Sequence, residues 1–350
     1  MTRVAILGAG IGREHLAAYR DLPGRFTVAA VVDQDAKRAE SIRGGDSFAV
    51  QTDLQLVLED PGIDLVDVCL PPHLHVPVTV RALAAGKHVI CEKPLATSMA
   101  DVDRIRQAAA QNGKQVFPVF QYRWGPSLTQ LRRLIATGMA GRPHVGAIET
   151  HWKRGADYYA VPWRGTWAGE QGGAVLGHAI HNHDLMTHFM GPVAAVSAMT
   201  ATRVNDIETE DCAALSFQMQ NGALCTSSIT LGAATDETRI RLVFEHLTAT
   251  SGTDPYAPGR QAWAFTARIA ENQQRIDAAL ADMPPEPAGF AGFLSEVAAA
   301  LAGKEHSAVS LEDGAASIEL VTAIYDAAQR GARVSLPLTP AHPLYGGWHS

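Results

Sequence analysis

The chain contains little cysteine and no long run of hydrophobic residues. Four of its 350 residues are cysteine, and no two of them stand in a Cys-x-x-Cys spacing. This usage predicts reduced thiols in the core of a cytoplasmic protein rather than a disulfide framework. No hydrophobic run approaches the roughly 18 residues of a membrane helix, and no basic segment followed by an apolar one precedes the first expected strand. We therefore expect a protein that neither crosses a membrane nor is secreted.

The chain also has few charged residues and lacks a basic excess. Charged residues make up 19% of the chain, hydrophobic residues make up 47%, and the net charge is −7. A negative balance argues against nucleic acid or an anionic membrane as a partner. The length of 350 residues exceeds what one hydrophobic core usually serves, which predicts two domains.

The first third of the sequence alternates short apolar segments with helical patterns. Such alternation predicts an α/β fold with a parallel, doubly wound sheet of the Rossmann type. The expected strands are residues 4–7, 28–32, 65–70, 88–91 and 115–119, and the intervening helices include residues 76–85 and 99–111.

A glycine-rich turn follows the first expected strand. Asp33 ends the second strand, 25 residues after the first glycine of the turn. Glycines let the backbone approach a pyrophosphate, the helix N-terminus favours its charge, and a carboxylate binds ribose hydroxyls. Because Asp33 would repel a 2′-phosphate, NAD is favoured over NADP, although Lys37 and Arg38 lie nearby. The expected dinucleotide-binding residues are Gly8, Gly10, Ile11, Gly12 and Asp33.

Beyond Gln121 the pattern changes to strands with few helices between them. Turn signals such as Asn221-Gly222 separate these strands, which predicts an α+β domain with a large, mostly antiparallel open sheet. The expected domains are therefore 1–122, which binds the dinucleotide, and 123–350, which binds substrate and forms oligomers. The expected strands are 145–152, 193–204, 213–219, 224–230 and 239–244, the expected helices are 287–301 and 311–330, and the last dozen residues are expected to form an extended tail.

The segment 85–96 places a lysine in an apolar setting directly before a proline. Val89 and Ile90 predict a buried strand that delivers Glu92, Lys93 and Pro94 to its carboxyl end. Ligands bind at that edge of an open α/β sheet. A lysine held there can serve as a general acid or base when burial and neighbouring charge bring its titration toward the working pH.

These motifs together resemble the Gfo/Idh/MocA family of oxidoreductases, which includes glucose-fructose oxidoreductase and inositol dehydrogenases. The resemblance implies a Rossmann domain followed by an α/β domain whose open sheet often forms an oligomer interface, and hence a homodimer or homotetramer. It also implies hydride transfer between nicotinamide and a hydroxyl-bearing carbon of a sugar, a sugar acid or a cyclic polyol. The motifs that carry it are the glycine turn, Asp33, residues 70–75, residues 85–89 leading into Glu92-Lys93-Pro94, and Gly172-Gly173 followed by His181.

The resemblance assigns roles to individual residues. Lys93 matches the catalytic lysine of the family, which binds the reacting hydroxyl and assists its proton transfer. His181 matches the histidine that donates or accepts the proton, and Pro94 matches a position often preceded by a cis peptide bond. The residues implied to line the cofactor side of the pocket are Pro71, His75, Glu92, Lys93 and Pro94.

Two departures from the family pattern concern these sites. Gly12 stands one place earlier than the third glycine of the usual fingerprint. The family usually carries Asp four residues before its histidine, where this chain has Gly177. In an α-helix that Asp would stand beside His181 and share its proton transfer. His178, His183 or a substrate carboxylate could substitute, or the two remaining catalytic residues suffice alone.

A run rich in histidine, residues 178–188, suggests a metal site as another interpretation. Its four histidines and one aspartate are ligand types that suit Zn²⁺. On an α-helix, however, His178 and His183 point in directions roughly 140° apart, so the run does not converge on one face. His181, Asp184 and His188 do share a face at spacings of three and four. Because spacing alone is weak support, we expect no metal, and we expect Asp184 to orient a neighbouring group.

Aromatic and cationic residues are frequent in the segments that precede the paired glycines. Aromatic rings stack on the apolar faces of sugars, and Arg and Lys bind hydroxyls or acid groups. The number of cations favours a sugar that carries an acid group, while packing between the two domains is the alternative for each aromatic residue. The expected substrate-binding residues are Tyr122, Arg123, Lys153, Tyr158, Trp163, Arg164, His178 and His181.

Two other functions are compatible with the sequence. Some proteins with this fold hydrolyse glycosides by transient oxidation, elimination and re-oxidation on a tightly held NAD. Others bind the dinucleotide without turnover and act as sensors or repressors. The intact Glu92-Lys93-Pro94 segment and His181 argue against a sensor, whereas the missing acid at position 177 leaves a hydrolase open.

Overall fold

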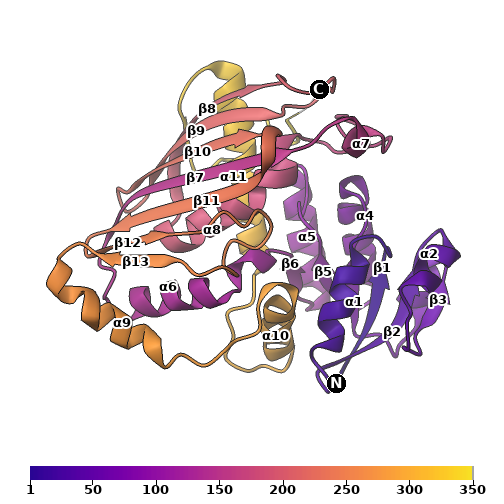
Figure 1. Cartoon of the computed structure of the whole chain (residues 1–350). Helices are drawn as coiled ribbons and strands as arrows, with labels where there is room; N and C mark the ends of the chain where they lie inside the picture. Colours follow the sequence, from indigo (N-terminus) through magenta and orange to yellow (C-terminus); the bar gives the residue numbers. More distant parts are fainter. Residues whose placement is uncertain (349–350) are drawn as a thin grey trace. The chain divides into compact units, whose positions relative to one another are not determined.

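The chain forms two compact units, each assembled around one sheet. Unit 1 comprises Met1–Phe120 and Phe290–Ile318, and unit 2 comprises Gln121–Gly289 and Glu319–Ser350. The computed structural model describes residues 1–348, whose course along the chain can be followed in Figure 1. Among these residues no helix combines the length and the apolar character needed to cross a membrane.

A six-stranded parallel sheet forms the core of unit 1. Its strand order, β3-β2-β1-β4-β5-β6, is that of a doubly wound dinucleotide-binding fold and confirms the predicted Rossmann domain. Residues 4–7 and 89–91 are fully buried, because helices cover both faces of such a sheet, and this explains their continuous apolar sequence. The strands are β1 (Thr2–Leu7), β2 (Phe26–Val32), β3 (Ala49–Gln51), β4 (Leu65–Val68), β5 (His88–Cys91) and β6 (Val116–Pro118).

The carboxyl ends of this sheet carry the residues expected to bind a dinucleotide. The glycine turn follows β1, and Asp33 follows β2. Pro71 follows β4, while Glu92 and Lys93 follow β5. Because β1 lies between β2 and β4, the connections run outward in both directions from this point. Ligands of open α/β sheets bind outside the carboxyl ends at such a switch point, so the topology brings these residues to one edge of unit 1.

Unit 1 also receives helices from much later in the sequence. Nearly all of α10 (Gly289–Leu301) and the first part of α11 (Leu311–Arg330) belong to it. The division after Phe120 is close to the expected boundary at residue 122, but residues 290–318 lie outside the second unit and correct the expected domain 123–350. Periodicity shows which face of a helix is apolar and not which sheet covers that face. The other helices are α1 (Gly12–Arg20), α2 (Ala36–Ser41), α3 (Leu54–Glu59), α4 (Pro72–Ala84) and α5 (Met99–Asn112).

An eight-stranded sheet, seen as one broad layer in Figure 1, forms the core of unit 2. Its order is β13-β12-β11-β7-β10-β9-β8-β14, and every neighbouring pair is antiparallel except β7 with β10. This confirms the predicted, mostly antiparallel sheet. Buried and exposed residues alternate along β9 and β10, because one face packs against α8 (Ile180–Met190). The strands are β7 (Pro143–Lys153), β8 (Val193–Ala201), β9 (Cys212–Met219), β10 (Leu224–Thr230), β11 (Gly232–Phe244), β12 (Leu247–Thr250), β13 (Ala264–Ala267) and β14 (Val334–Ser335).

Two segments of the C-terminal half differ from the sequence-based expectations. α10 begins at Gly289 rather than at Pro287. Residues 340–346 make turns instead of an extended tail, and the buried Trp348 donates from its indole nitrogen to the Gln171 carbonyl at 2.8 Å. Packing of the large Trp348 indole explains why residues 340–346 turn instead of extending as a tail. Positions 349–350 of the expected tail lie outside the described residues. The remaining elements are α6 (Pro126–Ala136), α7 (Ala156–Tyr159), α9 (Gln273–Ala281), the 3-10 turns η1 (Gln121–Arg123) and η3 (Ala270–Asn272), and the π-helical turn η2 (Val175–Ala179).

Candidate functional site

The glycine turn of unit 1 combines tight packing at two positions with open space at a third. Gly8 has φ +97°, and a Cβ there would collide with the Cys69 carbonyl oxygen. A Cβ at Gly12 would lie 2.8 Å from Cγ2 of Ile6, so this glycine permits close packing of α1 on β1. At Gly10 a Cβ would meet no atom of residues 1–348 within 4 Å. Gly12 thus performs the helix-packing role of the third fingerprint glycine although it stands one place early.

Asp33 is buried and held beside this turn. Its Oδ2 accepts a hydrogen bond from the Ala9 main chain at 2.9 Å, and its Oδ1 accepts one from the Asp35 main chain at 2.9 Å. The exposed Arg38 lies 3.8 Å from the same carboxylate. No side chain caps the N-terminus of α1, and Ile11 just before it is exposed. An open helix N-terminus beside a fixed carboxylate fits the pyrophosphate and ribose of a dinucleotide.

His75 joins the loop after β4 to the loop after β5. Its Nδ1 lies 2.6 Å from the Pro94 carbonyl oxygen, its Nε2 lies 2.7 Å from that of Leu70, and the ring is buried. Burial lowers the pKa of His75, while the two carbonyl groups favour a protonated ring. The Lys93–Pro94 peptide bond is cis, in agreement with the resemblance. Because main-chain oxygens engage both ring nitrogens, a cofactor contact of His75 stays a prediction.

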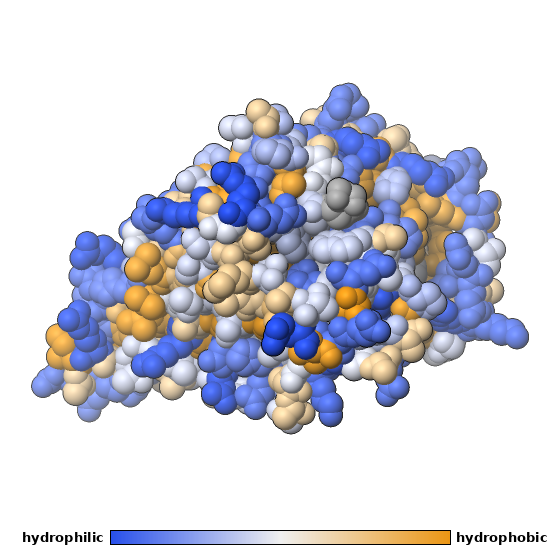
Figure 2. Space-filling model, turned by 90° about the horizontal axis from the view of Figure 1, so that it is seen from above, coloured by the Kyte–Doolittle hydropathy of each residue, from blue (hydrophilic) through white to orange (hydrophobic). Residues whose placement is uncertain are grey.

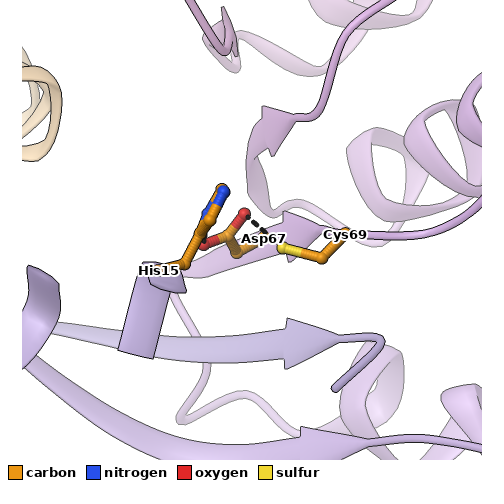
Figure 3. Close-up of side chains that lie close together, drawn as sticks. All are labelled: His15, Asp67 and Cys69. Carbon is orange, nitrogen blue, oxygen red and sulfur yellow. Dashed lines mark hydrogen bonds and ion pairs between the residues drawn. The ribbon is translucent and has the colours of Figure 1, made fainter. Parts of the chain in front are cut away.

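His15 of α1 lies between two carboxylates in the core of unit 1. Its Nδ1 is 2.9 Å from Oδ2 of Asp67, and its Nε2 is 3.0 Å from Oε1 of Glu92. Tyr19 donates to Asp67 at 2.9 Å, and Cys69 donates to the other Asp67 oxygen at 3.5 Å. Figure 3 shows His15 on its helix beside Asp67 and Cys69 of the neighbouring strand and loop. We did not predict this network from the sequence, although Asp67 inside an apolar strand is a signal that a partner is buried with it.

Three members of this network also have the composition of a metal site. Within residues 1–348, the ligand atoms of His15, Asp67 and Cys69 lie within 4.8 Å of one another. Both nitrogens of His15 already bond to carboxylates, and burial raises the pKa of the Cys69 thiol, which opposes the thiolate that a metal requires. The arrangement therefore fits an ion-pair network better than a metal centre.

In unit 2 the ring of His181 stacks on the ring of Tyr122. The ring centroids lie 4.4 Å apart with the planes inclined by 21°, and both side chains are buried. Arg123, the next residue, donates two hydrogen bonds to the buried carboxylate of Asp184 at 2.8 and 2.6 Å. Asp184 thus orients its neighbour as expected. Substrate contacts of Tyr122 and Arg123 stay predictions, because stacking and ion pairing already engage these side chains.

A second group in unit 2, the aromatic cluster, consists of Trp152, Arg154, Tyr158, Trp163, Arg164, His178 and Tyr256. The Tyr158 hydroxyl lies 3.2 Å from Nε2 of His178, and the Trp152 ring packs edge-on against the same histidine. Arg154 lies over Tyr158 at 5.1 Å from the ring centroid and pairs with Asp236 at 3.1 Å. The structure therefore brings Tyr158, Trp163, Arg164 and His178 together, and their contact with a substrate stays a prediction.

The two arginines of the aromatic cluster differ in their charge balance. Arg164 lies 3.8 Å from the Tyr158 centroid and 4.8 Å from that of Trp163, and its side chain is half-buried. Unlike Arg154, it has no carboxylate within ion-pair distance among the described residues. Lys153 lies outside the cluster, because successive strand residues project to opposite faces and Trp152 occupies the inner one. Strand alternation thus separates Lys153 from the other expected substrate-binding residues.

A carboxylate faces position 177, although the residue there is glycine. A Cβ at Gly177 would lie 3.6 Å from Oε1 of Glu170, whose side chain is buried. The other Glu170 oxygen accepts a hydrogen bond from the Gly165 main chain at 2.7 Å. Gly177 lies in the π-helical turn η2, which corrects the expected α-helical relation between positions 177 and 181. Glu170 was not among the residues expected at the site, because nothing in its spacing from Gly177 indicates that the two meet.

The histidines of the run 178–188 have different neighbours. His178 lies beside Tyr158, whereas Nε2 of His183 lies 3.0 Å from the Ser227 hydroxyl on the sheet. Burial lowers the pKa of His183 to about 4, and His188 is exposed. His183 therefore does not face position 177, and within residues 1–348 these histidines belong to no group of clustered metal ligands.

Glu210 anchors the paired glycines and the π-helical turn. Its carboxylate accepts hydrogen bonds from the main chain of Gly173 at 3.1 Å and of Val175 at 3.0 Å, and from the Tyr325 hydroxyl at 3.0 Å. Burial raises the pKa of Glu210 to about 7 although these donors favour the charged form. This residue was not expected from the sequence either, since its partners lie up to 115 positions away.

Comparisons with known proteins agree with this organisation. A family model described as an oxidoreductase family with an NAD-binding Rossmann fold matches residues 2–120. A second model, described as the GFO/IDH/MocA C-terminal domain, matches residues 128–250. The two matches cover most of both sheets.

Similar proteins include several dehydrogenases. The WlbA dehydrogenase of Bordetella pertussis, solved in complex with NADH and UDP-GlcNAcA, is 26% identical with a TM-score of 0.83, and the match covers 96% of this chain and 99% of that one. A myo-inositol 2-dehydrogenase of Thermotoga maritima is 27% identical over 63% of this chain and 66% of its own length. A levoglucosan dehydrogenase of Pseudarthrobacter phenanthrenivorans is 28% identical over 57% of this chain and 54% of its own length. The matches thus span about half to two thirds of these two curated relatives.

Proposed function

The chain belongs to the Gfo/Idh/MocA family of oxidoreductases, and we propose that it is an NAD-dependent dehydrogenase that acts on a hydroxyl-bearing carbon of an acidic sugar. When bound, the nicotinamide exchanges a hydride with that carbon. The glycine turn and the open N-terminus of α1 bind the pyrophosphate, and Asp33 binds the ribose hydroxyls. The carboxylate of Asp33 favours NAD over NADP, because a 2′-phosphate beside it would be repelled.

Lys93 and His181 are the groups proposed to handle the hydroxyl proton. Lys93 follows β5 at the carboxyl edge of the parallel sheet, and its backbone is fixed because Pro94 bonds to His75 and the Lys93 main chain donates to Glu92 at 3.1 Å. His181 is held in one orientation by its stacking on Tyr122. A fixed direction matters because a proton-transferring group must reach its partner within hydrogen-bond distance.

Glu170 is proposed to supply the carboxylate that relatives place at position 177. Its Oε1 faces the site where a side chain of residue 177 would begin. Its other oxygen is fixed by the Gly165 main chain, so the group cannot turn away without losing that hydrogen bond. In this proposal the Glu170 carboxylate takes the place of the aspartate that relatives carry at position 177.

The proposal of an acidic substrate rests on the charge balance of Arg164. This half-buried guanidinium lies on an aromatic ring and has no carboxylate within ion-pair distance in the part of the chain that the structure describes. It can therefore bind the carboxylate of a sugar acid in bidentate fashion while Tyr158 and Trp163 contact the ring. The Bordetella WlbA dehydrogenase was solved with UDP-GlcNAcA, a sugar acid, and this complex supports the same class of substrate. Nucleotide-linked and free sugar acids share this chemistry.

The test compares each sugar acid with its neutral parent, for example glucuronate with glucose, and free sugars with their UDP-linked forms. NADH formation is followed by absorbance, and bound NAD is sought in the purified protein by mass spectrometry. We expect kcat/KM for the acid to exceed that for the neutral sugar by at least about tenfold, with loss of this preference in Arg164→Gln and partial retention in Arg164→Lys. Equal rates on acid and neutral sugars would contradict the acidic substrate.

Two further outcomes would contradict a dehydrogenase altogether. Release of nitrophenol from a nitrophenyl glycoside without net NADH formation would identify a hydrolase. Tight NADH binding without turnover of any sugar on the panel would identify a sensor. Comparison of NADH with NADPH binding in the same assay tests the assignment of Asp33.

A further inference from the structure

The network around His15 links three parts of unit 1. His15 lies on the first turn of α1, three residues after Gly12 of the glycine turn. Asp67 is part of β4, and Glu92 directly precedes Lys93 after β5. His15, Asp67, Tyr19 and Glu92 are all buried, so water does not screen the charges among them.

The geometry determines the protonation of His15. A neutral imidazole carries one N–H, so one of its nitrogens would present a lone pair to a carboxylate. Both nitrogens of His15 face carboxylate oxygens at 2.9 and 3.0 Å, and two favourable hydrogen bonds require the doubly protonated ring. Burial disfavours this charge, yet Asp67 outweighs it and raises the pKa of His15 well above its usual value.

The other groups around the ring are consistent with a charged histidine. Tyr19 from the same helix and Cys69 from the loop after β4 both donate to Asp67, which keeps that carboxylate an acceptor. The ring of Phe290 from α10 lies 4.5 Å from the ring of His15 and carries no charge. The two carboxylates and one imidazolium leave one net negative charge in this network, and one of the carboxylates belongs to the residue that precedes Lys93.

We propose that His15 is a positioning residue: its protonated ring bridges Asp67 and Glu92 and thereby fixes the backbone that carries Lys93 to the helix that begins at the glycine turn. The second Glu92 oxygen completes the link, because it accepts from the Lys93 main chain at 3.1 Å. The proposal rests on the dehydrogenase function for the role of Lys93. Its physical core, a charged and bridging His15, does not depend on that function.

The first experiment therefore measures protonation in the wild-type protein. Histidine labelled with ¹⁵N is observed by NMR between pH 6 and 9, and His15 is identified by the signals that change in Tyr19→Phe and Asp67→Asn. We expect both ring nitrogens of His15 to carry protons at pH 8, where a histidine of ordinary pKa is singly protonated. A singly protonated His15 at pH 8 would overturn the proposal, whatever the enzyme's activity.

The second experiment measures kinetics on the best substrate of the sugar panel. His15→Gln is expected to lower kcat by about ten- to a hundredfold with less than about threefold change in KM for the sugar, because misplacement of a catalytic group by about an ångström has effects of this size. The matched control is Tyr19→Phe, which removes a hydrogen bond from the same network and keeps the charged bridge. Equal losses in the two variants would indicate a merely structural role and overturn the proposal.

The pH profile separates positioning from general damage. Without the imidazolium, the two carboxylates favour the charged form of Lys93, so the pH dependence of sugar oxidation should move to higher pH in His15→Gln. The double variant His15→Gln with Glu92→Gln also lacks one carboxylate. In it the midpoint of the pH dependence of sugar oxidation should return toward the wild-type value. An unchanged midpoint in His15→Gln would contradict the proposal, and the NMR measurement on the wild-type protein decides the question if His15→Gln does not fold. Absence of turnover in the wild type would instead contradict the proposed function and leave the NMR result as the test of the bridge.

Discussion

At the scale of single residues, the candidate site depends on buried polar groups held by the main chain. His75 bonds to two carbonyl oxygens, Glu210 accepts from two amides, and Asp33 accepts from two more. A buried polar group costs free energy unless it is paired, so each of these side chains fixes the loop that satisfies it. These hydrogen bonds therefore connect the loops after β1, β4 and β5 of unit 1, and the turn at Gly173 of unit 2, to buried side chains.

Removal of the Lys93 amine tests its role. Lys93→Ala should lower kcat by about 10²- to 10⁴-fold, the usual contribution of a general acid or base. NADH binding, followed by energy transfer from tryptophan, should change little, because the glycine turn and Asp33 remain intact. A rate close to that of the wild type would remove Lys93 from the mechanism.

Exchange of the carboxylate between positions 170 and 177 tests the role of Glu170. Glu170→Gln should lower kcat by about tenfold or more, because the amide cannot accept or stabilise the proton in the same way. Gly177→Asp added to this variant should recover part of the loss, since a Cβ fits there without contacts closer than 3.6 Å. Activity measured with the same substrate decides the question, and full activity of Glu170→Gln would contradict the assignment.

At the scale of elements, the glycine turn shows how one motif divides two tasks. Gly12 lets α1 approach β1, whereas Gly10 leaves space above the turn. The tasks are structurally independent, because only the first involves contacts within the protein. Substitution by alanine can therefore separate stability from cofactor binding.

Gly12→Ala should destabilise unit 1 by about 1–3 kcal/mol, because its Cβ would lie only 2.8 Å from Ile6. Gly10→Ala should leave the urea midpoint nearly unchanged but weaken NADH binding, because the new methyl group would occupy the space that we propose for the pyrophosphate. Urea unfolding and NADH titration of both variants provide the comparison. The division of roles fails if Gly10→Ala is the more strongly destabilised variant.

At the scale of the whole molecule, two buried groups give opposite pH dependences of stability. The pKa of His183 is lowered from 6.5 to about 4, so its contribution is lost as pH falls from about 6.5 to 4. The pKa of Glu210 is raised from 4.5 to about 7, so its contribution is present at low pH and is lost as pH rises from about 4.5 to 7. Between pH 4.5 and 6.5 the two contributions change the free energy of unfolding in opposite directions with pH, so they nearly cancel in the wild type.

Single substitutions should reveal each slope. Between pH 5 and 6.5, stability should fall with rising pH in His183→Gln and rise with pH in Glu210→Gln, each by about 1 kcal/mol per pH unit. All six tryptophans lie in unit 2, so their fluorescence during urea unfolding reports on the unit that contains both groups. Identical slopes in the two variants would disprove this account.

The exposed face of the eight-stranded sheet is the expected oligomer interface. Leu224 and Val145 are register neighbours on β10 and β7, and they are 57% and 47% exposed. Leu224→Glu with Val145→Glu should convert a dimer or tetramer to a monomer in light scattering, while Ile269→Glu, equally exposed outside the sheet, should not. Figure 2 shows hydrophobic residues scattered among hydrophilic ones on the face that it presents, and scattered residues of this kind do not mark an interface. A monomeric wild-type protein in light scattering would contradict the expected oligomer interface on the sheet.

Local features of the sequence predicted much of the fold. β5, β10 and α11 have the bounds expected from periodicity, and the glycine turn lies where strand, glycines and Asp33 placed it. These features depend on backbone conformation and on the alternation of apolar residues, both of which are written in neighbouring positions. β11 begins earlier than expected, at Gly232, because an irregularity between Gly232 and Glu237 interrupts the alternation.

The sequence by itself determined the family, the two kinds of sheet and the sheet edge that carries the residues proposed to bind a dinucleotide. Only the tertiary structure placed His15 between carboxylates 52 and 77 positions away, Glu170 beside Gly177, and residues 290–318 in unit 1. The reason is that glycine turns and periodic strands are set by local sterics and burial. A charge network and the docking of a helix depend instead on contacts between distant segments, which no spacing along the chain encodes.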